Sequence, residues 1–142
     1  MPTSRASAVW EGKLKDGKGN FRAASGAFSG PYTFATRFEG KQGTNPEELI
    51  AAAHAACFSM ALSAGLEKAG KPATRVETTA ACTMEMVDGT PTITKMELKV
   101  RGKVPGLDPA AFQKAAEEAK GGCPVSRALA GIRQITLDAK LE

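Results

Sequence analysis

The stretch TNPEELIAAAHAACFSMALSAGLEKAG, residues 44–70, decides the fold. Asn45, Pro46 and Glu48 form a strong helix start. Asn caps free backbone N–H groups, Pro is suited to the first helical turn, and Glu follows at the capping-box position. Gly70 then predicts where the helix ends. The stretch therefore predicts one long helix between these two signals.

An uncharged run of 18 residues, Leu49 to Leu66, lies inside this predicted helix. Its length raises the alternative of a membrane span, but it is rich in alanine and contains His54, which favours a helix buried in protein. A helix that is apolar on nearly all sides needs cover all round, and one small sheet covers one side only. We therefore expect no membrane span and a second copy of the chain, as a homodimer.

Composition indicates one ordinary soluble domain spanning residues 1–142, with a net charge of +4 and three cysteines. A chain of this length can bury a core without disulfides or a structural metal. The first twenty residues contain no apolar run of secretory length, so we expect a cytoplasmic location. The basic residues are scattered and no reading motif accompanies them, so we expect no nucleic-acid partner.

The rest of the pattern is typical of an α+β fold, with strands near both ends and helices between them. A separate strand is predicted from Tyr32 to Phe38, with Arg37 on the face opposite Phe34 and Phe38. The other predicted elements are strands at 5–13, 20–24, 74–87, 94–100 and 134–141, a helix at 108–120 ended by two glycines, and a short helix from 123 toward 131.

The three cysteines have different settings, and their odd number argues against a disulfide framework or a paired zinc site. Cys82 lies on an apolar strand face, where a thiol packs in the core. Cys123 opens a short helix with Arg127 one turn later, and both features favour a thiolate. The alternative for Cys123 is a residue that only caps a tight turn after two glycines.

Cys57 lies in the middle of the long helix, where burial alone raises the pKa of a thiol. It needs a cation to react. His54, three residues earlier, shares nearly the same helix face, although a lone helical histidine more often packs or forms a hydrogen bond. Arg37 is the other candidate, because a guanidinium can hold a thiolate and a carboxylate together. The alternative for Arg37 is an exposed strand residue without a role at the thiol.

A buried thiolate next to a second thiol suits peroxide reduction. At the ordinary thiol pKa of about 8.5 only about 3% is ionised near pH 7, against about 90% at a pKa near 6. The thiolate attacks the O–O bond and becomes a sulfenic acid, which condenses with the second thiol to a disulfide.

Two runs, TRFEGKQGTNPEELIAAAHAACFSMAL (residues 36–62) and GCPVSRAL (residues 122–129), closely resemble the osmotically inducible protein C (OsmC) family, related to the organic hydroperoxide resistance proteins. The resemblance implies an intertwined homodimer of α+β subunits, with antiparallel sheets around a long buried central helix. It also implies a thiol-dependent peroxidase that reduces organic hydroperoxides to alcohols. No metal and no bound cofactor are implied.

The resemblance also assigns site residues. It makes Cys57 the peroxidatic cysteine and Cys123 the resolving cysteine, which reverses the electrostatic preference for Cys123 as the attacker. Arg37 becomes the cation that stabilises the thiolate, and Glu47 the carboxylate that orients the arginine. Cys82 matches no motif of the family and stays with the core.

Helix geometry adds a constraint on these residues. Glu47 and Cys57 are ten residues apart, about 15 Å along a continuous helix and about 80° around it, too far for one arginine to bridge. Either the Glu47 end comes from a neighbouring chain or the helix bends near its start. We therefore expect the site at a dimer interface.

Several further expectations follow from the residues and the resemblance. Phe34, Phe38, Phe58 and Met60 could line an apolar pocket that favours organic peroxides, with core packing as the alternative. A dithiol, such as a lipoyl-bearing protein, is the expected reductant. Two other functions stay open: a cysteine hydrolase that uses His54 and Cys57, and a non-catalytic dimer that senses redox state or binds a small molecule.

Overall fold

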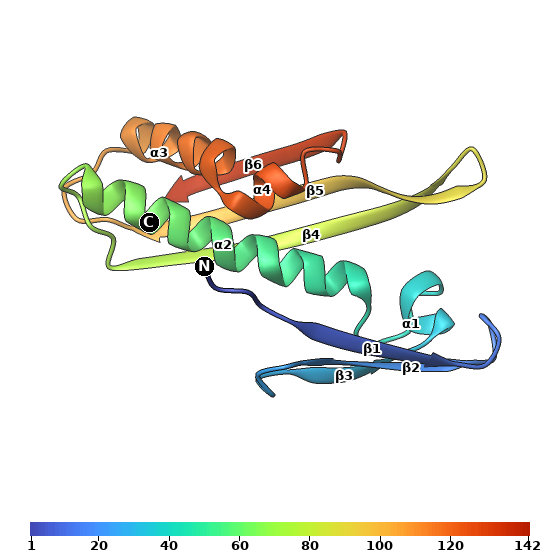
Figure 1. Ribbon diagram of the computed structural model, residues 1–142. Coiled ribbons are helices and arrows are strands. Elements are labelled where there is room, and N and C mark those ends of the chain that lie inside the picture. The colour runs from blue at the N-terminus through green and yellow to red at the C-terminus, as the bar shows by residue number, and fades with distance from the viewer. The chain divides into compact units, whose positions relative to one another are not determined.

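Two three-stranded sheets and one long helix dominate the α+β fold, which the computed structural model describes over residues 1–142 (Figure 1). The chain divides into two compact units, Met1–Leu49 and Ile50–Glu142, with one sheet in each.

The sheet of the first unit is an antiparallel meander. It consists of β1 (Ala6–Glu11), β2 (Lys18–Ala23) and β3 (Ser29–Tyr32), in that order. The predicted opening hairpin is therefore confirmed. Tyr32 packs against Trp10 and Phe21, with ring centroids 5.5 and 5.8 Å apart.

The predicted strand from Tyr32 to Phe38 is wrong, because residues Phe34–Phe38 form a short helix, α1. Thr33 explains the difference. Its side chain accepts from the Thr36 backbone N–H at 3.2 Å, while the Thr36 hydroxyl oxygen accepts from the Thr33 N–H at 3.0 Å. This reciprocal cap favours a helix over continued extension. Arg37 consequently lies with the aromatic residues, its guanidinium carbon 5.3 Å from the Phe38 ring centroid, and not on an opposite face.

The long helix α2 (Pro46–Lys68) begins and ends as the sequence predicts. Asn45 Oδ1 accepts from the Glu48 N–H at 2.9 Å. At the other end Gly70 has a φ of 77°, and the next residue, Lys71, donates its N–H to the Leu66 carbonyl at 2.9 Å. The positive φ at Gly70 lets the chain reverse and satisfy carbonyls of the last turn.

One face of α2 belongs to the core of the second unit, and the other face is exposed. The buried side chains His54, Phe58, Leu62 and Leu66 recur at helical spacing. By length and composition alone α2 could cross a membrane, and only 22% of its apolar window is buried within the chain. The expectation of a helix covered all round is therefore not met by one copy.

The sheet of the second unit has the order β4–β5–β6, with strands Arg75–Val87, Thr90–Lys103 and Gln134–Leu141. β4 and β5 are antiparallel, but β6 runs parallel to β5, which corrects the expectation of purely antiparallel sheets. The reason is the connection between them, α3 (Pro109–Gly122) followed by α4 (Pro124–Ala128), which carries the chain back to the other end of the sheet.

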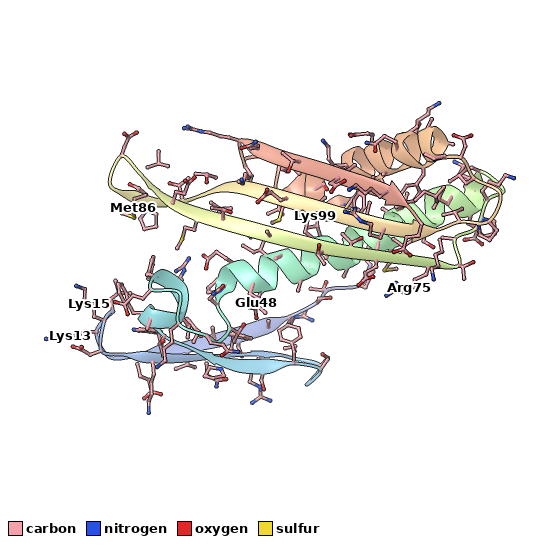
Figure 2. The ribbon with its side chains drawn as sticks, turned by 180° about the vertical axis from the view of Figure 1, so that it is seen from behind. Lys13, Lys15, Glu48, Arg75, Met86 and Lys99 are labelled. Atoms are coloured by element: carbon pink, nitrogen blue, oxygen red, sulfur yellow. The ribbon has the colours of Figure 1, made fainter.

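Figure 1 shows α2, α3 and α4 on the same face of this sheet. The core lies between them and contains, besides α2 residues, Leu98, Val100, Phe112, Ala116 and Cys123. The predicted inward face of β5 is confirmed, and Lys99 points to the uncovered side (Figure 2). Cys82 is half-buried on β4 and lies outside this core cluster, so its predicted core position is met only in part.

Candidate functional site

The structure brings together the two cysteines that the sequence singled out. Cys57 in α2 and Cys123 between α3 and α4 are hydrogen-bonded through their sulfur atoms, which lie 2.9 Å apart. Both residues belong to the second unit. This contact between thiols from distant parts of the chain is the centre of the candidate site.

Cys123 owes its position to the helix junction. It ends α3 and caps α4, with φ of −60° and ψ of 124°. Pro124 follows, and a proline disfavours helical conformation in the residue before it. The Cys-Pro pair therefore interrupts the helical path and leaves Cys123 extended between two helices. The two glycines before it are part of α3, so the predicted end of α3 at Lys120 is two residues early.

The two thiols differ in exposure. Cys57 is half-buried, whereas the Cys123 side chain has no exposed surface. Only Cys57 is therefore open to a molecule arriving from solvent.

The two thiols also differ in pKa. Burial raises the pKa of Cys57, and its hydrogen bond with Cys123 adds to this effect. Burial acts in the same sense on Cys123, but hydrogen bonds from Cys57, Ser126 and Val125 outweigh it and lower the pKa of Cys123. Within the second unit the sulfur of Cys123 is therefore the better thiolate, as the local electrostatics of the sequence indicated.

The source of this stabilisation was only partly predicted. Arg127, the expected cation, is exposed, and the groups that lower the Cys123 pKa are the Cys57 thiol, the Ser126 hydroxyl and backbone N–H groups. Ser126 and Val125 were not predicted as contributors. Their signal was the start of a helix at Cys123, which brings the following backbone N–H groups and the side chain three residues later near the first residue.

His54 does not serve Cys57 as a cation. Its Nε2 lies 2.6 Å from the Ser126 hydroxyl oxygen, and the side chain has no exposed surface. Burial lowers the pKa of His54 and keeps the imidazole neutral. A hydrolase mechanism in which His54 activates Cys57 finds no support in these contacts.

Arg37 and Glu47 form the second predicted pair. Arg37 Nε and Nη2 both donate to Glu47 Oε1, at 3.1 and 2.9 Å, and the Glu47 side chain is buried. Asn45 Nδ2 donates to the Thr36 carbonyl at 2.9 Å, which ties α1 to the start of α2. Arg37 keeps three of its five N–H donors for other acceptors. This pair lies in the first unit, and the two thiols lie in the second.

Within the second unit, the two residues proposed for an apolar pocket do not share one surface. Phe58 is fully buried in the core of the second unit, as the packing alternative stated, while Met60 is 76% exposed. Phe34 and Phe38 stack on each other within α1, with centroids 4.8 Å apart. The pocket hypothesis therefore loses Phe58.

Two thiols in contact, one partly open to solvent and one buried, are the arrangement expected of a dithiol redox protein. No group of three or more His, Cys, Asp or Glu side chains that could hold a metal ion occurs in the structure. The family model for OsmC-like proteins matches residues 38–138, and the chain belongs to the OsmC family.

Curated relatives extend the match to nearly the whole chain. Peroxiredoxin OsmC of Escherichia coli (strain K12) is 50% identical over 139 residues, 97% of this chain and 96% of that protein. An organic hydroperoxide resistance protein of Xanthomonas axonopodis pv. citri (strain 306) is 36% identical over 100 residues, 69% of this chain and 68% of that protein. The predicted class, a cysteine-based peroxidase of the OsmC family, is confirmed by these relationships.

Solved structures show the same fold at lower identity. An organic hydroperoxide resistance protein OsmC from Legionella pneumophila has a TM-score of 0.78 at 22% identity, covering 99% of this chain and 98% of that chain. An organic hydroperoxide resistance protein from Elizabethkingia anophelis has a TM-score of 0.73 at 24% identity, covering 99% and 98%. The OsmC-like α+β fold is therefore shown over the full chain.

The buried His54, the only histidine, gives stability a pH dependence. Because its folded pKa is lowered, the unfolded chain binds the proton first as pH falls. The free energy of unfolding contributed by this group is constant above about pH 6.5 and is lost below it, by up to about 1.4 kcal/mol per pH unit. Urea unfolding between about pH 7 and pH 5 should show this loss in wild type and not in His54→Gln. Equal slopes in both proteins would contradict it.

Proposed function

We propose that this protein reduces organic hydroperoxides to alcohols, with Cys57 as the peroxidatic thiol and Cys123 as the resolving thiol. One observation carries the assignment: the two sulfur atoms lie 2.9 Å apart, and only Cys57 is partly exposed. The substrate class rests on the names of the relatives, which include organic hydroperoxide resistance proteins.

The chemistry takes three balanced steps. The Cys57 thiolate attacks the peroxide O–O bond, which gives a sulfenic acid and, after proton transfer, the alcohol. The Cys123 thiolate then attacks the Cys57 sulfur, an S–S bond forms, and hydroxide leaves and is protonated to water. An external dithiol, of which a lipoyl-bearing protein is our candidate, reduces the disulfide and becomes a disulfide itself.

Access decides between the two thiols as attacker, although the lower pKa favours Cys123. A buried thiolate cannot meet a substrate, whereas Cys57 can if its pKa is lowered. The pair Arg37–Glu47 is our proposed source of that effect. Glu47 holds two N–H groups of Arg37, and the remaining donors are suited to a thiolate or a peroxide oxygen.

We propose further that the active unit is an intertwined homodimer with the site at its interface. The exposed face of α2 supports this, because between Leu49 and Leu66 it carries Ala53, Ala56, Met60 and Ala64 and no charged residue. The spacing of Glu47 and Cys57 along α2 supports it too, since one arginine cannot span both within one helix. A cytoplasmic location stays a prediction.

The cysteine roles are tested by substitution. Cys57→Ser should abolish catalytic loss of cumene hydroperoxide in the presence of a dithiol, because no peroxidatic thiol is left. Cys123→Ser should still consume about one equivalent, because Cys57 can be oxidised once. Rapid-mixing assays of peroxide consumption measure both.

Cys82→Ser is the matched control and should retain wild-type turnover. Oxidation that survives in Cys57→Ser and disappears in Cys123→Ser would reverse the assignment. Ligand binding without any turnover would favour the non-catalytic alternative, and ester cleavage without a reductant would favour a hydrolase.

Arg37→Ala should slow the reaction of Cys57 with hydroperoxide by about tenfold or more near pH 7, because without the proposed cation burial alone sets the pKa of Cys57, in the raised direction. The difference from wild type should close only at a pH high enough to ionise that thiol. Glu47→Gln should change the rate in the same direction, because it leaves Arg37 less well held.

Arg22→Ala, at an exposed position of β2, is the control and should leave the pH profile unchanged. A loss in Arg37→Ala that is equal at every pH would show that Arg37 supports the fold and not the thiolate.

The dimer is tested at Met60, which is 76% exposed on the uncharged face of α2. Met60→Glu should shift the protein toward monomer, because it places a charge in the proposed interface. Met86→Glu is the matched control, since Met86 is 65% exposed near the β4–β5 turn (Figure 2). Sedimentation measures both. A monomeric wild type would contradict the proposal.

A further inference from the structure

A buried polar pair lies directly behind the resolving thiol. His54 Nε2 and Ser126 Oγ are 2.6 Å apart, with 0% and 7% of the two residues exposed. Ser126 lies three residues after Cys123, the N-cap of α4, and its side chain and backbone N–H lower the pKa of Cys123 by hydrogen bonding. One continuous chain of contacts thus links Cys57, Cys123, Ser126 and His54. The proposed reaction gives roles to Cys57 and Cys123 and none to Ser126 and His54.

The unpaired nitrogen of His54 fixes the direction of these hydrogen bonds. Nδ1 is buried and has no hydrogen-bond partner. A buried N–H without a partner is rarer in proteins than an acceptor without one. The proton of the neutral imidazole therefore sits on Nε2, where it can be donated to the Ser126 oxygen.

The direction of the first bond decides that of the second. A serine hydroxyl has one hydrogen to donate. When Ser126 Oγ accepts from His54, that hydrogen is available for the sulfur of Cys123. With the other tautomer the hydroxyl would donate to His54, and the Cys123 sulfur would lose this donor.

We propose that His54 is a positioning residue for the resolving thiol: its Nε2–H holds Ser126 so that the Ser126 hydroxyl donates to the Cys123 sulfur. The role in catalysis rests on the proposed function, whereas the hydrogen bonds themselves do not. The group that His54 and Ser126 hold in place is the Cys123 thiolate.

The arrangement assists Cys123 in two steps. A thiolate held ready attacks the sulfenic acid of Cys57, forming the S–S bond and releasing hydroxide, which is protonated to water. During recycling an external dithiol attacks the half-buried Cys57 sulfur, and Cys123 leaves as a thiolate. A more stable thiolate leaves faster. His54 stays neutral throughout and transfers no proton.

Few titratable or charged side chains lie near the Cys123 thiol. Cys57 and His54 are the titratable side chains that contact Cys123 or its Ser126 partner. α4 contributes only backbone N–H groups and the Ser126 hydroxyl. Lys120 donates to the Ile135 carbonyl at 3.5 Å, and Arg127 is exposed. Titration of Cys123 therefore reports on its contacts with Cys57 and Ser126, and of these the variants below change only the contact with Ser126.

The experiment follows the Cβ resonance of Cys123 against pH in the reduced full-length protein, labelled at cysteine. Ser126→Ala and His54→Phe should both raise the titration midpoint, because each removes the hydroxyl donor or its support. The double variant should move it no further than either change alone. His54→Gln, which keeps an N–H near the Nε2 position, should stay close to wild type.

Kinetics supply a second measurement. After one equivalent of hydroperoxide, Ser126→Ala and His54→Phe should form the disulfide about tenfold more slowly, the value of a hydrogen bond to a charged group. Formation of the Cys57 sulfenic acid should slow less than disulfide formation, because Ser126 and His54 act on Cys57 only through Cys123. Leu66→Ala, a buried change on the same helix, is the control and should lower stability without moving the Cys123 titration.

Unchanged titration in Ser126→Ala or His54→Phe would overturn the proposal. Equal shifts in His54→Phe and His54→Gln would also overturn it, because they would indicate packing and not donation. Loss of the proposed function is a different result. It would appear as peroxidase activity in Cys57→Ser, and the titration, which uses no peroxide, would still decide the hydrogen bonds.

Discussion

The contact between the sulfur atoms of Cys57 and Cys123 depends on how the helices of the second unit are placed. It requires α2 to present Cys57 on the side that faces α4 and requires the chain to interrupt its helical path at Cys123. The buried face of α2 meets the first condition through its helical spacing. Pro124 meets the second, because it disfavours a helical conformation at the residue before it.

The two thiols lie in different environments, Cys123 buried and Cys57 partly exposed, and the two steps of the proposed redox reaction need different environments. A resolving thiol benefits from burial among hydrogen-bond donors, which keeps it from stray oxidants and stabilises its thiolate. An attacking thiol must be reachable, and Cys57 is only half-buried, yet burial still raises its pKa. A nearby positive charge would lower that pKa, and in the proposed mechanism this charge is Arg37, which Glu47 holds by hydrogen bonds.

Much of this was predictable from the sequence. The caps of α2, the inward face of β5 and the final strand all depend on local patterns, and all were predicted. Residues 34–38 were not, because alternating aromatic residues resemble a strand, and only the reciprocal cap of Thr33 and Thr36 reveals a helix. The parallel pairing of β6 depends on the path of α3 and α4. The bond between His54 and Ser126 joins residues 72 positions apart, and no local pattern reports such a distance.

The parallel strand β6 has a consequence for the reaction. Because β5 and β6 lie side by side, the segment that carries Cys123 is anchored in the same sheet at both of its ends. The entropic cost of bringing two thiols 66 positions apart into contact is therefore met when the chain folds and not during the reaction. In the proposed reaction the second thiol acts at an effective concentration set by the fold and not by the cell, so trapping of an oxidised Cys57 would not slow when the protein is scarce.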